Sequence, residues 1–359
     1  MKIFNTLDRY IIKKFLGTYI FAIILILAIT VMFDINEKLD AFIKAPLDET
    51  IFDYFLNFLP YFANQFSPLF TFIAVIFFTS KLADNSEIIA MLSTGMSYKR
   101  LLLPYMISAL VIAMSSYILS AYIIPPANIK RIDFTNTYVK NKRVDYGNNI
   151  MLQVAPGQIA YMSRYDNTTK TGYKFSLESF KDKKLKSRLT AQIIKWDTAY
   201  QWQVRDYEIR NFLETKENIE SGKNLDTIIP FEPRDFLIAK NDHEKMTSPE
   251  LYEYIQQQKQ RGVANIKSFE IEYEKRYAMC AAAFILTIIG LTLSSKKVKG
   301  GMGLNIGIGL VLSFSYILFM TVTSSFAVSG LTSPMVAMWI PNFVYSIIAI
   351  ILYRRASIG

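Results

Sequence analysis

The 359-residue sequence contains little cysteine, histidine or charge, and each shortage excludes a class of protein. The single cysteine, Cys280, cannot form an intrachain disulfide, and the single histidine, His243, cannot belong to a histidine-based metal cluster. The sequence has no GxxxxGK[ST] phosphate loop, so the chain cannot hydrolyse a nucleotide by that route. Charged residues make up 19% against a hydrophobic fraction of 52%, which excludes a disordered chain and a plain soluble enzyme.

The apolar excess lies in long stretches without a charged residue. These stretches are residues 15–33, 54–80, 101–129, 277–295 and 300–353. A helix needs about 20 apolar residues to cross a bilayer, so the last stretch is too long for one span, and the turn-forming residues 329–334 divide it. The sequence therefore predicts six membrane spans at 12–34, 54–80, 100–124, 274–295, 304–328 and 334–353. The first is expected to be a retained anchor, because no small-residue cleavage site follows it.

The basic residues that flank these stretches predict the orientation of the chain. They lie before span one, in the loop between spans two and three (residues 81–99), after span four and after span six. Basic residues in short loops favour the cytoplasmic side, so both termini are predicted to be cytoplasmic and residues 127–265 to be outside. The net charge of +10 thus belongs to the membrane flanks, and nucleic acid is not an expected partner.

The outside region, residues 127–265, has the pattern of an antiparallel sheet with one buried face. Residues 158–163 and 173–180 alternate at period two, and residues 189–196 and 201–212 are further strand candidates around a turn at 197–200. Ser248, Pro249 and Glu250 predict a helix start, with the helix running to Arg261 and Gly262. The fold class is therefore an α-helical membrane protein with six spans in a 3+3 arrangement and an inserted, jelly-roll-like β domain. Its predicted segments are 1–126, 127–265 and 266–359.

The ordered features resemble the lipopolysaccharide-export permeases, the LptF/LptG family, over nearly the whole chain. The resemblance rests on residues 7–11 (LDRYI), which look more like the LptG branch, on residues 86–97 (SEIIAMLSTGMS), and on residues 274–277, 296–303 and 341–342. It implies a permease subunit, not an enzyme, of an ABC-type exporter that extracts lipopolysaccharide from the Gram-negative inner membrane. The implied partners are a cytoplasmic ATPase dimer, which uses the ATP, a second permease of the family and a periplasmic bridge protein with a matching β-fold. No cofactor of the chain itself is implied.

Residues in the loop between spans two and three are candidates for contact with the ATPase. Ile88, Ile89, Met91 and Leu92 follow Glu87, and Gly95 ends the segment, which predicts a short amphipathic helix. Glu87, Ile88, Met91, Leu92 and Gly95 are selected as the coupling residues. The resemblance implies that this helix couples the permease to the ATPase, with Glu87 as a polar contact. The alternative is an interfacial helix that lies on the bilayer.

Spans one and five are implied by the family to form a lateral lipid gate. Leu312, Tyr316, Phe319 and Thr323 fall on one stripe of span five, and Phe33 and Asp34 lie at the outer end of span one. The alternative for the stripe is ordinary helix packing. Gly303 and Gly307 form a GxxxG pair, a pattern that allows two helices to approach closely.

Three other functions remain open at this point. A related permease for a different lipid or a lipoprotein would have the same organisation. A non-transporting membrane scaffold or sensor would need neither motor nor lipid cavity. A lipid-modifying enzyme would need a catalytic group at the membrane face, yet the sequence places no histidine near a span and no paired acids there.

Overall fold

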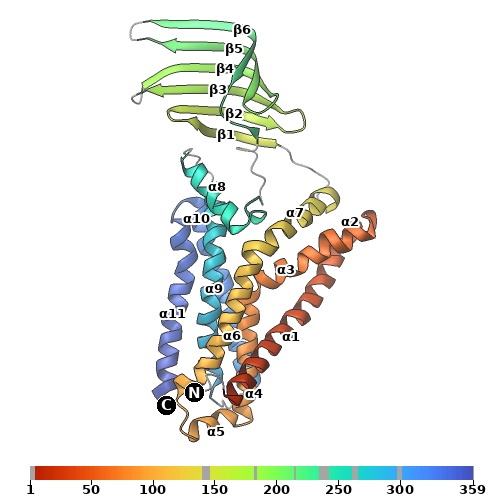
Figure 1. Cartoon of the computed structure of the whole chain (residues 1–359), viewed down its shortest axis with the longest axis vertical. Coiled ribbons are helices and arrows are strands. Elements are labelled where there is room, and N and C mark those ends of the chain that lie inside the picture. Colours follow the sequence, from red (N-terminus) through yellow and green to blue (C-terminus); the bar gives the residue numbers. More distant parts are fainter. Residues whose placement is uncertain are drawn as a thin grey trace. The chain divides into compact units, whose positions relative to one another are not determined.

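The computed structural model describes residues 5–139, 146–181, 184–213, 216–233, 242–260, 266–296 and 301–358. The chain divides into two compact units. The helical unit contains the elements from α1 to η3, the segment Glu244–Pro249, and α9 to α11. The β unit contains six strands and most of α8. Figure 1 shows the elements of both units.

The first half of the helical unit alternates long and short helices. The elements are α1 (Thr6–Glu37), α2 (Leu39–Lys44), the π-helix η1 (Glu49–Phe55), α3 (Leu56–Gln65), α4 (Ser67–Asp84), α5 (Glu87–Ser93), α6 (Tyr98–Ile118), the π-helix η2 (Leu119–Ile123), α7 (Ile124–Phe134) and the π-helix η3 (Thr135–Val139). The second half consists of α9 (Lys267–Ser294), α10 (Gly301–Ser329) and α11 (Pro334–Ile358).

Six helices among the described residues are long and apolar enough to cross a membrane, as predicted. The predicted break in the last apolar stretch is confirmed, since Gly330 turns the chain with a φ of +86° between α10 and α11. The second and third spans differ from their predictions. Residues 54–80 are divided at Phe66, and the candidate span there is α4 alone, Ser67–Asp84. In the third span, the helix does not end at residue 124 but continues through α7 and η3 to Val139.

The continuation has a physical cause in the π-helix η2. A π-turn shifts the backbone hydrogen bonds by one residue, and Pro125 and Pro126 then sit in the first turn of α7, where a missing N–H costs little. The predicted domain boundary at residue 127 therefore falls inside a helix, and residues 127–139 belong to the helical unit.

The centre of the helical unit is the packing of α4 against α9. A Cβ at Gly290 of α9 would lie 2.7 Å from Val75 Cγ1 and 3.0 Å from Val75 Cβ, so the missing side chain lets the two helices approach. A Cβ at Gly309 of α10 would lie still closer to Ile76 Cδ1 of α4. By contrast, nothing lies within 4 Å of a Cβ at Gly303 or Gly307, so this GxxxG pair makes no close approach within the chain.

The inserted β unit is an antiparallel sheet whose six strands follow one another in sheet order. They are β1 (Tyr146–Ala155), β2 (Gln158–Asp166), β3 (Thr171–Lys181), β4 (Lys184–Trp196), β5 (Gln201–Phe212) and β6 (Glu217–Ile228). The inserted all-β region and the strands predicted from their alternation are confirmed. The sequential order is that of a meander. Helix α8 (Ser248–Gln260) begins where predicted, and its predicted end at Arg261 and Gly262 lies outside the described residues.

The pairing of the sheet is interrupted along one row of residues that crosses strands β2 to β6. Residues 163, 174, 192, 206 and 223, here called the crease row, are skipped in the pairing of their strands, and Lys174 and Asp206 have left-handed backbone with φ of 51° and 53°. The spacing between inward-facing residues across the crease row is three instead of two. The pairs are Met162 and Tyr165, Gly172 and Phe175, Ala191 and Ile194, and Val204 and Tyr207.

The crease row keeps both parts of the sheet on one core. Buried residues from the two sides of the row belong to the same hydrophobic cluster. Phe231, which follows β6, covers the cluster by packing its ring on Phe175 and on Trp202, and its carbonyl accepts a 3.0 Å hydrogen bond from Trp202 Nε1.

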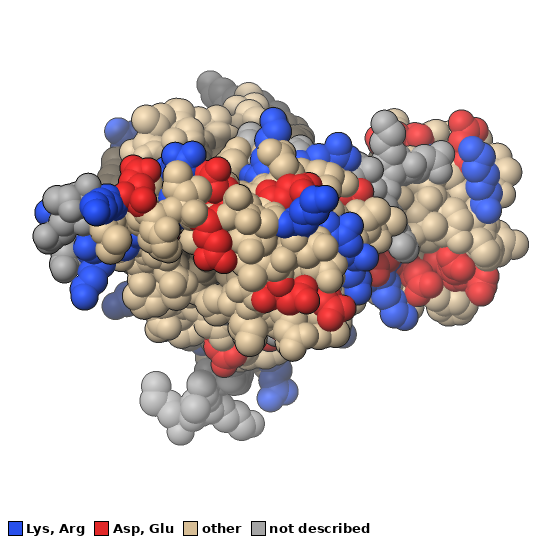
Figure 2. Space-filling view, turned by 90° about the horizontal axis from the view of Figure 1, so that it is seen from above, with Lys and Arg blue, Asp and Glu red and all other residues tan. Residues whose placement is uncertain are grey.

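Basic and acidic side chains are interspersed over the face that Figure 2 presents.

We predict that Gly290→Val destabilises the helical unit, while Gly307→Val does not. The new side chain at residue 290 must displace the β-branched Val75, and such overpacking costs about 1–3 kcal/mol. The side chain at residue 307 enters open space. Thermal unfolding of the detergent-solubilised protein measures both variants. Equal melting temperatures would contradict the packing described for α4 and α9.

Candidate functional site

The short helix α5 lies at the end of the helical unit that also carries both chain ends (Figure 1), here called the inner end. The chain turns sharply on either side of it, since Ser86 and Gly95 have left-handed backbone with φ of 60° and 88°. Asn85 Nδ2 donates a 3.1 Å hydrogen bond to Glu87 Oε1 at the helix start. These turns fix α5 as a separate element between α4 and α6.

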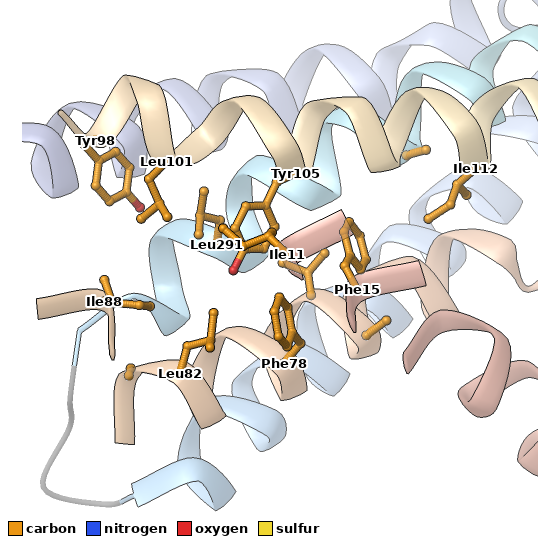
Figure 3. Close-up of a cluster of buried hydrophobic side chains, with 14 of the residues drawn as sticks. Ile11, Phe15, Phe78, Leu82, Ile88, Tyr98, Leu101, Tyr105, Ile112 and Leu291 are labelled. Atoms are coloured by element: carbon orange, nitrogen blue, oxygen red, sulfur yellow. The ribbon is translucent and has the colours of Figure 1, made fainter. Parts of the chain in front are cut away.

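One face of α5 is packed against the core of the helical unit. Ile88 is fully buried in a cluster that includes Leu82 of α4, Leu101 of α6 and Leu291 of α9 (Figure 3). Met91 and Leu92 pack on the same cluster and are partly buried. The buried face of α5 thus shares one hydrophobic cluster with α4, α6 and α9.

The opposite face of α5 is exposed and contains a residue that the sequence analysis did not select. Ile89 is 56% exposed, and Ser93 and Thr94 are exposed with it. Of the predicted coupling residues, Glu87 is half-buried and Gly95 is exposed, whereas Ile88, Met91 and Leu92 face the chain's own core. Ile88 and Ile89 are adjacent and identical in type, so the sequence alone did not tell which one faces outward.

A buried ion pair ties the start of α1 to the start of α6 at the same inner end. Arg100 Nη1 and Nη2 lie 2.8 Å and 2.6 Å from the two carboxylate oxygens of Asp8, and the Asp8 side chain is only 2% exposed. The backbone N–H of Asn5 donates a further hydrogen bond to Asp8. The hydrogen bonds from Arg100 lower the pKa of Asp8, which lies before the predicted span, so the pair is ionised at neutral pH. The sequence analysis quoted Asp8 as part of a motif but did not identify its partner.

The predicted gate residues occupy two different environments. On α10, Tyr316 and Thr323 are buried and Leu312 and Phe319 are half-buried, and Tyr316 Oη donates a 2.9 Å hydrogen bond to Asn342 Oδ1 of α11. The stripe thus packs inside the helical unit, as the alternative of ordinary helix packing requires. The exposed residues of α10 lie on its other side: Val311, Phe314, Leu318 and Val322.

The two predicted residues at the end of α1 also differ. Phe33 is 71% exposed, whereas Asp34 is buried. Asp34 forms an ion pair with Lys38, and its Oδ1 accepts a hydrogen bond from Lys38 Nζ. Lys38 also donates a hydrogen bond to Tyr54 Oη at 2.5 Å. Whether any of these residues contacts lipid stays a prediction.

A second polar cluster, here called the outer joint, lies where the chain leaves and re-enters the helical unit. Glu244 accepts hydrogen bonds from Arg131 at 3.3 Å and from Tyr61 at 3.4 Å, and its backbone carbonyl accepts one from Asn128. The Arg131 guanidinium also stacks on the Tyr61 ring at 4.1 Å from its centre. Helices α3 and α7 are thereby joined to the segment that follows the β unit.

Arg276 of α9 completes the outer joint. Its side chain is 2% exposed, and it donates hydrogen bonds to Ser248 Oγ and to the Met246 carbonyl, each at 2.9 Å, and to Glu272 Oε1 at 3.3 Å. Helices α3, α7 and α9 are therefore joined to residues 244–249, the described segment that precedes most of α8. The resemblance motif included Arg276, but only the structure shows what its guanidinium binds.

The fold and these clusters define a polytopic membrane protein with an inserted β unit and a short helix docked at the inner end. The sequence profile described as "Lipopolysaccharide export system permease LptF/LptG" matches residues 9–355, nearly the whole chain. The chain therefore belongs to the LptF/LptG family, the permease of the lipopolysaccharide export system, and is a multi-pass protein of the inner membrane. The match does not separate the two branches, so the LptG assignment stays a prediction. A comparison with curated proteins gives no match.

The Asp8–Arg100 pair predicts unequal effects of removing its two members. Arg100→Met leaves the buried Asp8 carboxylate without its guanidinium, and an unpaired buried acceptor costs about 2–3 kcal/mol. Asp8→Asn leaves a cation whose side chain is 34% exposed and can reach water, so the loss is about 1 kcal/mol. The double variant recovers part of the Arg100→Met loss. Thermal unfolding of the four proteins tests this order, and a larger loss for Asp8→Asn would refute it.

From the contacts of the outer joint we predict that Arg276→Met frees residues 244–249 from the helical unit. Three acceptors lose their donor, and we expect a loss of about 2 kcal/mol or more together with faster proteolysis within residues 242–249. The control is Lys275→Met, next to it on α9, whose long 3.8 Å ion pair with Glu272 is partly exposed and contributes about 0.5 kcal/mol or less. Identical cleavage rates in the two variants would show that the joint does not hold the segment.

Proposed function

We propose that this chain is one transmembrane half of an ATP-driven lipopolysaccharide exporter, with a second permease of the family as the other half. A cytoplasmic ATPase dimer supplies the energy, since the sequence has no phosphate loop of its own. Family membership supports the cargo class. The observation that carries the proposal is α5, a short helix held between two sharp turns, docked by one face on the helical core and exposed on the other.

In this proposal α5 is the contact with the ATPase. Ile89 fills an apolar recess of the motor, and Glu87 adds a polar contact beside it. Ile88, Met91 and Leu92 act from the other side of the same helix, because they pass movement of α5 to α4, α6 and α9. The side chains of α5 thus divide into an outward pair, Glu87 and Ile89, and an inward set.

The proposed orientation places the inner end in the cytoplasm. Lys13 and Lys14 of α1, Lys81 and Lys99 beside α5, and Arg354 and Arg355 near the end of α11 all belong to this end, which the positive-inside rule assigns to the cytoplasm. The β unit is then periplasmic.

The proposed lipid path follows the exposed apolar surfaces of α1 and α10. Phe33 lies on the exposed side of α1, and Val311, Phe314 and Leu318 lie on that of α10. Tyr316 and Thr323 support this path from behind, by packing α10 on α11, instead of contacting lipid. Lipopolysaccharide would enter from the outer leaflet between such surfaces of the two permeases.

The β unit is proposed to pass the lipid to a periplasmic bridge protein by strand addition. Its two edge strands, β1 and β6, each have one side without a partner strand among the described residues, and such an edge accepts a further strand through main-chain hydrogen bonds. The outer joint, anchored to α3, α7 and α9, would make the base of the β unit follow the movement of these helices.

We predict that Ile89→Asp and Glu87→Lys abolish coupling without unfolding the chain. The aspartate would place a charge in an apolar contact, and the lysine would reverse the charge of the polar one. Each variant should reduce recovery of the ATPase with the purified permease and lower ATP-dependent lipid release at least tenfold.

The control for this prediction is Ile88→Ala, one residue away on the buried face. It removes core contacts, so it should lower the melting temperature of the permease through a loss of about 2–5 kcal/mol. Normal ATPase recovery and lipid release in both Ile89→Asp and Glu87→Lys would refute the coupling role of α5.

A further inference from the structure

A groove of about 580 Å³ lies between α1 and α4, on the side of α1 away from its buried residues. Along α1 it is lined by Tyr10, Lys13 and Lys14 and then by Gly17, Thr18 and Phe21, and from α4 by Phe77. Ile11 and Phe15 of α1 are fully buried in the core, so this packing fixes Lys13, Lys14 and Gly17 on the exposed side. No function described above uses these residues.

The polarity of the groove changes along α1. Lys13 and Lys14 directly precede the uncharged stretch that begins at Phe15, so they lie at the level of lipid headgroups. Phe21 lies two turns further along the helix, about 10 Å from Lys14 into the apolar region. The part of the groove beside Lys13 and Lys14 is therefore charged, and the part beside Phe21 and Phe77 is apolar over a length of several acyl carbons.

The apolar part of the groove is open because of one glycine. Nothing lies within 4 Å of a Cβ placed at Gly17, and Phe77, facing the groove from α4, is 42% exposed. A larger residue at position 17 would occupy the space where an acyl chain fits.

We propose that this groove binds one anionic phospholipid. Its phosphate lies between the ammonium groups of Lys13 and Lys14, and one acyl chain follows Gly17 and Phe21 against the Phe77 ring. Two adjacent cations above an apolar channel match a headgroup of net negative charge, and each lysine near a membrane surface adds attraction to anionic lipid. The proposed orientation makes this a lipid of the cytoplasmic leaflet, whereas the proposed lipopolysaccharide path begins in the other leaflet.

Two lysines at the same end of the helical unit provide a matched control. Lys81 and Lys99 are exposed and flank α5, but neither lines the groove. A non-specific effect of basic charge would depend on all four lysines equally, whereas a site depends on Lys13 and Lys14.

The experiment uses the permease with its native subunits, in nanodiscs of phosphatidylcholine with increasing phosphatidylglycerol. Native mass spectrometry counts the phosphatidylglycerol molecules that stay bound. Lys13→Gln/Lys14→Gln should bind phosphatidylglycerol about tenfold more weakly, and Lys81→Gln/Lys99→Gln should bind it as the unchanged protein does. Gly17→Leu, which keeps every charge, should also lose the bound lipid. Equal binding in all variants, or equal losses in the two lysine pairs, would overturn the proposal.

A second measurement identifies what occupies the groove in the native membrane. Phe21 is replaced with the photoactivatable benzoylphenylalanine, and the irradiated product is analysed. A crosslink to phospholipid supports the site. A crosslink to lipopolysaccharide or to another protein subunit overturns it. Neither measurement requires lipid export, so failure of this site and failure of the exporter assignment are distinguishable.

Discussion

The close approach of α4 and α9 is the contact on which the rest of the helical unit depends. Gly290 allows it, and the other spanning helices pack around the pair: α1 and α10 on α4, and α6 and α11 on α9. Within a bilayer the surrounding lipid is as apolar as leucine, so helices gain little from hydrophobic burial and associate through close van der Waals contact. The hydrophobic stretch of α4 is accordingly 78% buried, whereas that of α1 is 6% buried.

Ion pairs of buried and half-buried side chains stand at the two ends of this bundle. The Asp8–Arg100 pair closes the inner end, and the Arg131–Glu244 pair together with Arg276 closes the outer end. A charge inside the hydrocarbon region is costly, while a pair at its boundary keeps access to water and to backbone acceptors. The two clusters therefore fix the ends of helices whose middle parts are held by packing. The first cluster lies at the same end as α5, and the second holds residues 244–249 to the helical unit.

The sequence predicted the elements better than the direction in which their residues face. Long uncharged stretches identify spans because the bilayer imposes a length, and alternation identifies strands because one face is buried. Alternation does not predict the crease row, since Lys174 and Asp206 adopt left-handed backbone that residues of their type seldom adopt. Nor does the uncharged stretch predict that the third helix continues past residue 124. Pro125 and Pro126 normally interrupt a helix, and the preceding π-helix η2 accommodates them.

The hardest property to predict is which side of a membrane helix faces lipid and which side packs on other helices. The proposed coupling and lipid contacts depend on it. A span that is apolar on every side carries no signal that separates the lipid side from the packed side, so Tyr316 and Thr323 could be placed on a stripe but not assigned to a surface. On α5 the same difficulty separates Ile88 from Ile89. In helix α1, by contrast, the packed side can be recognised. Its core residues Ile11 and Phe15 recur at a spacing of four, and this fixes the other side of the helix, with Lys13, Lys14 and Gly17, as surface. A helix so little buried by its own chain leaves most of its surface to lipid or to another subunit, which agrees with a permease that acts as one half of a pair.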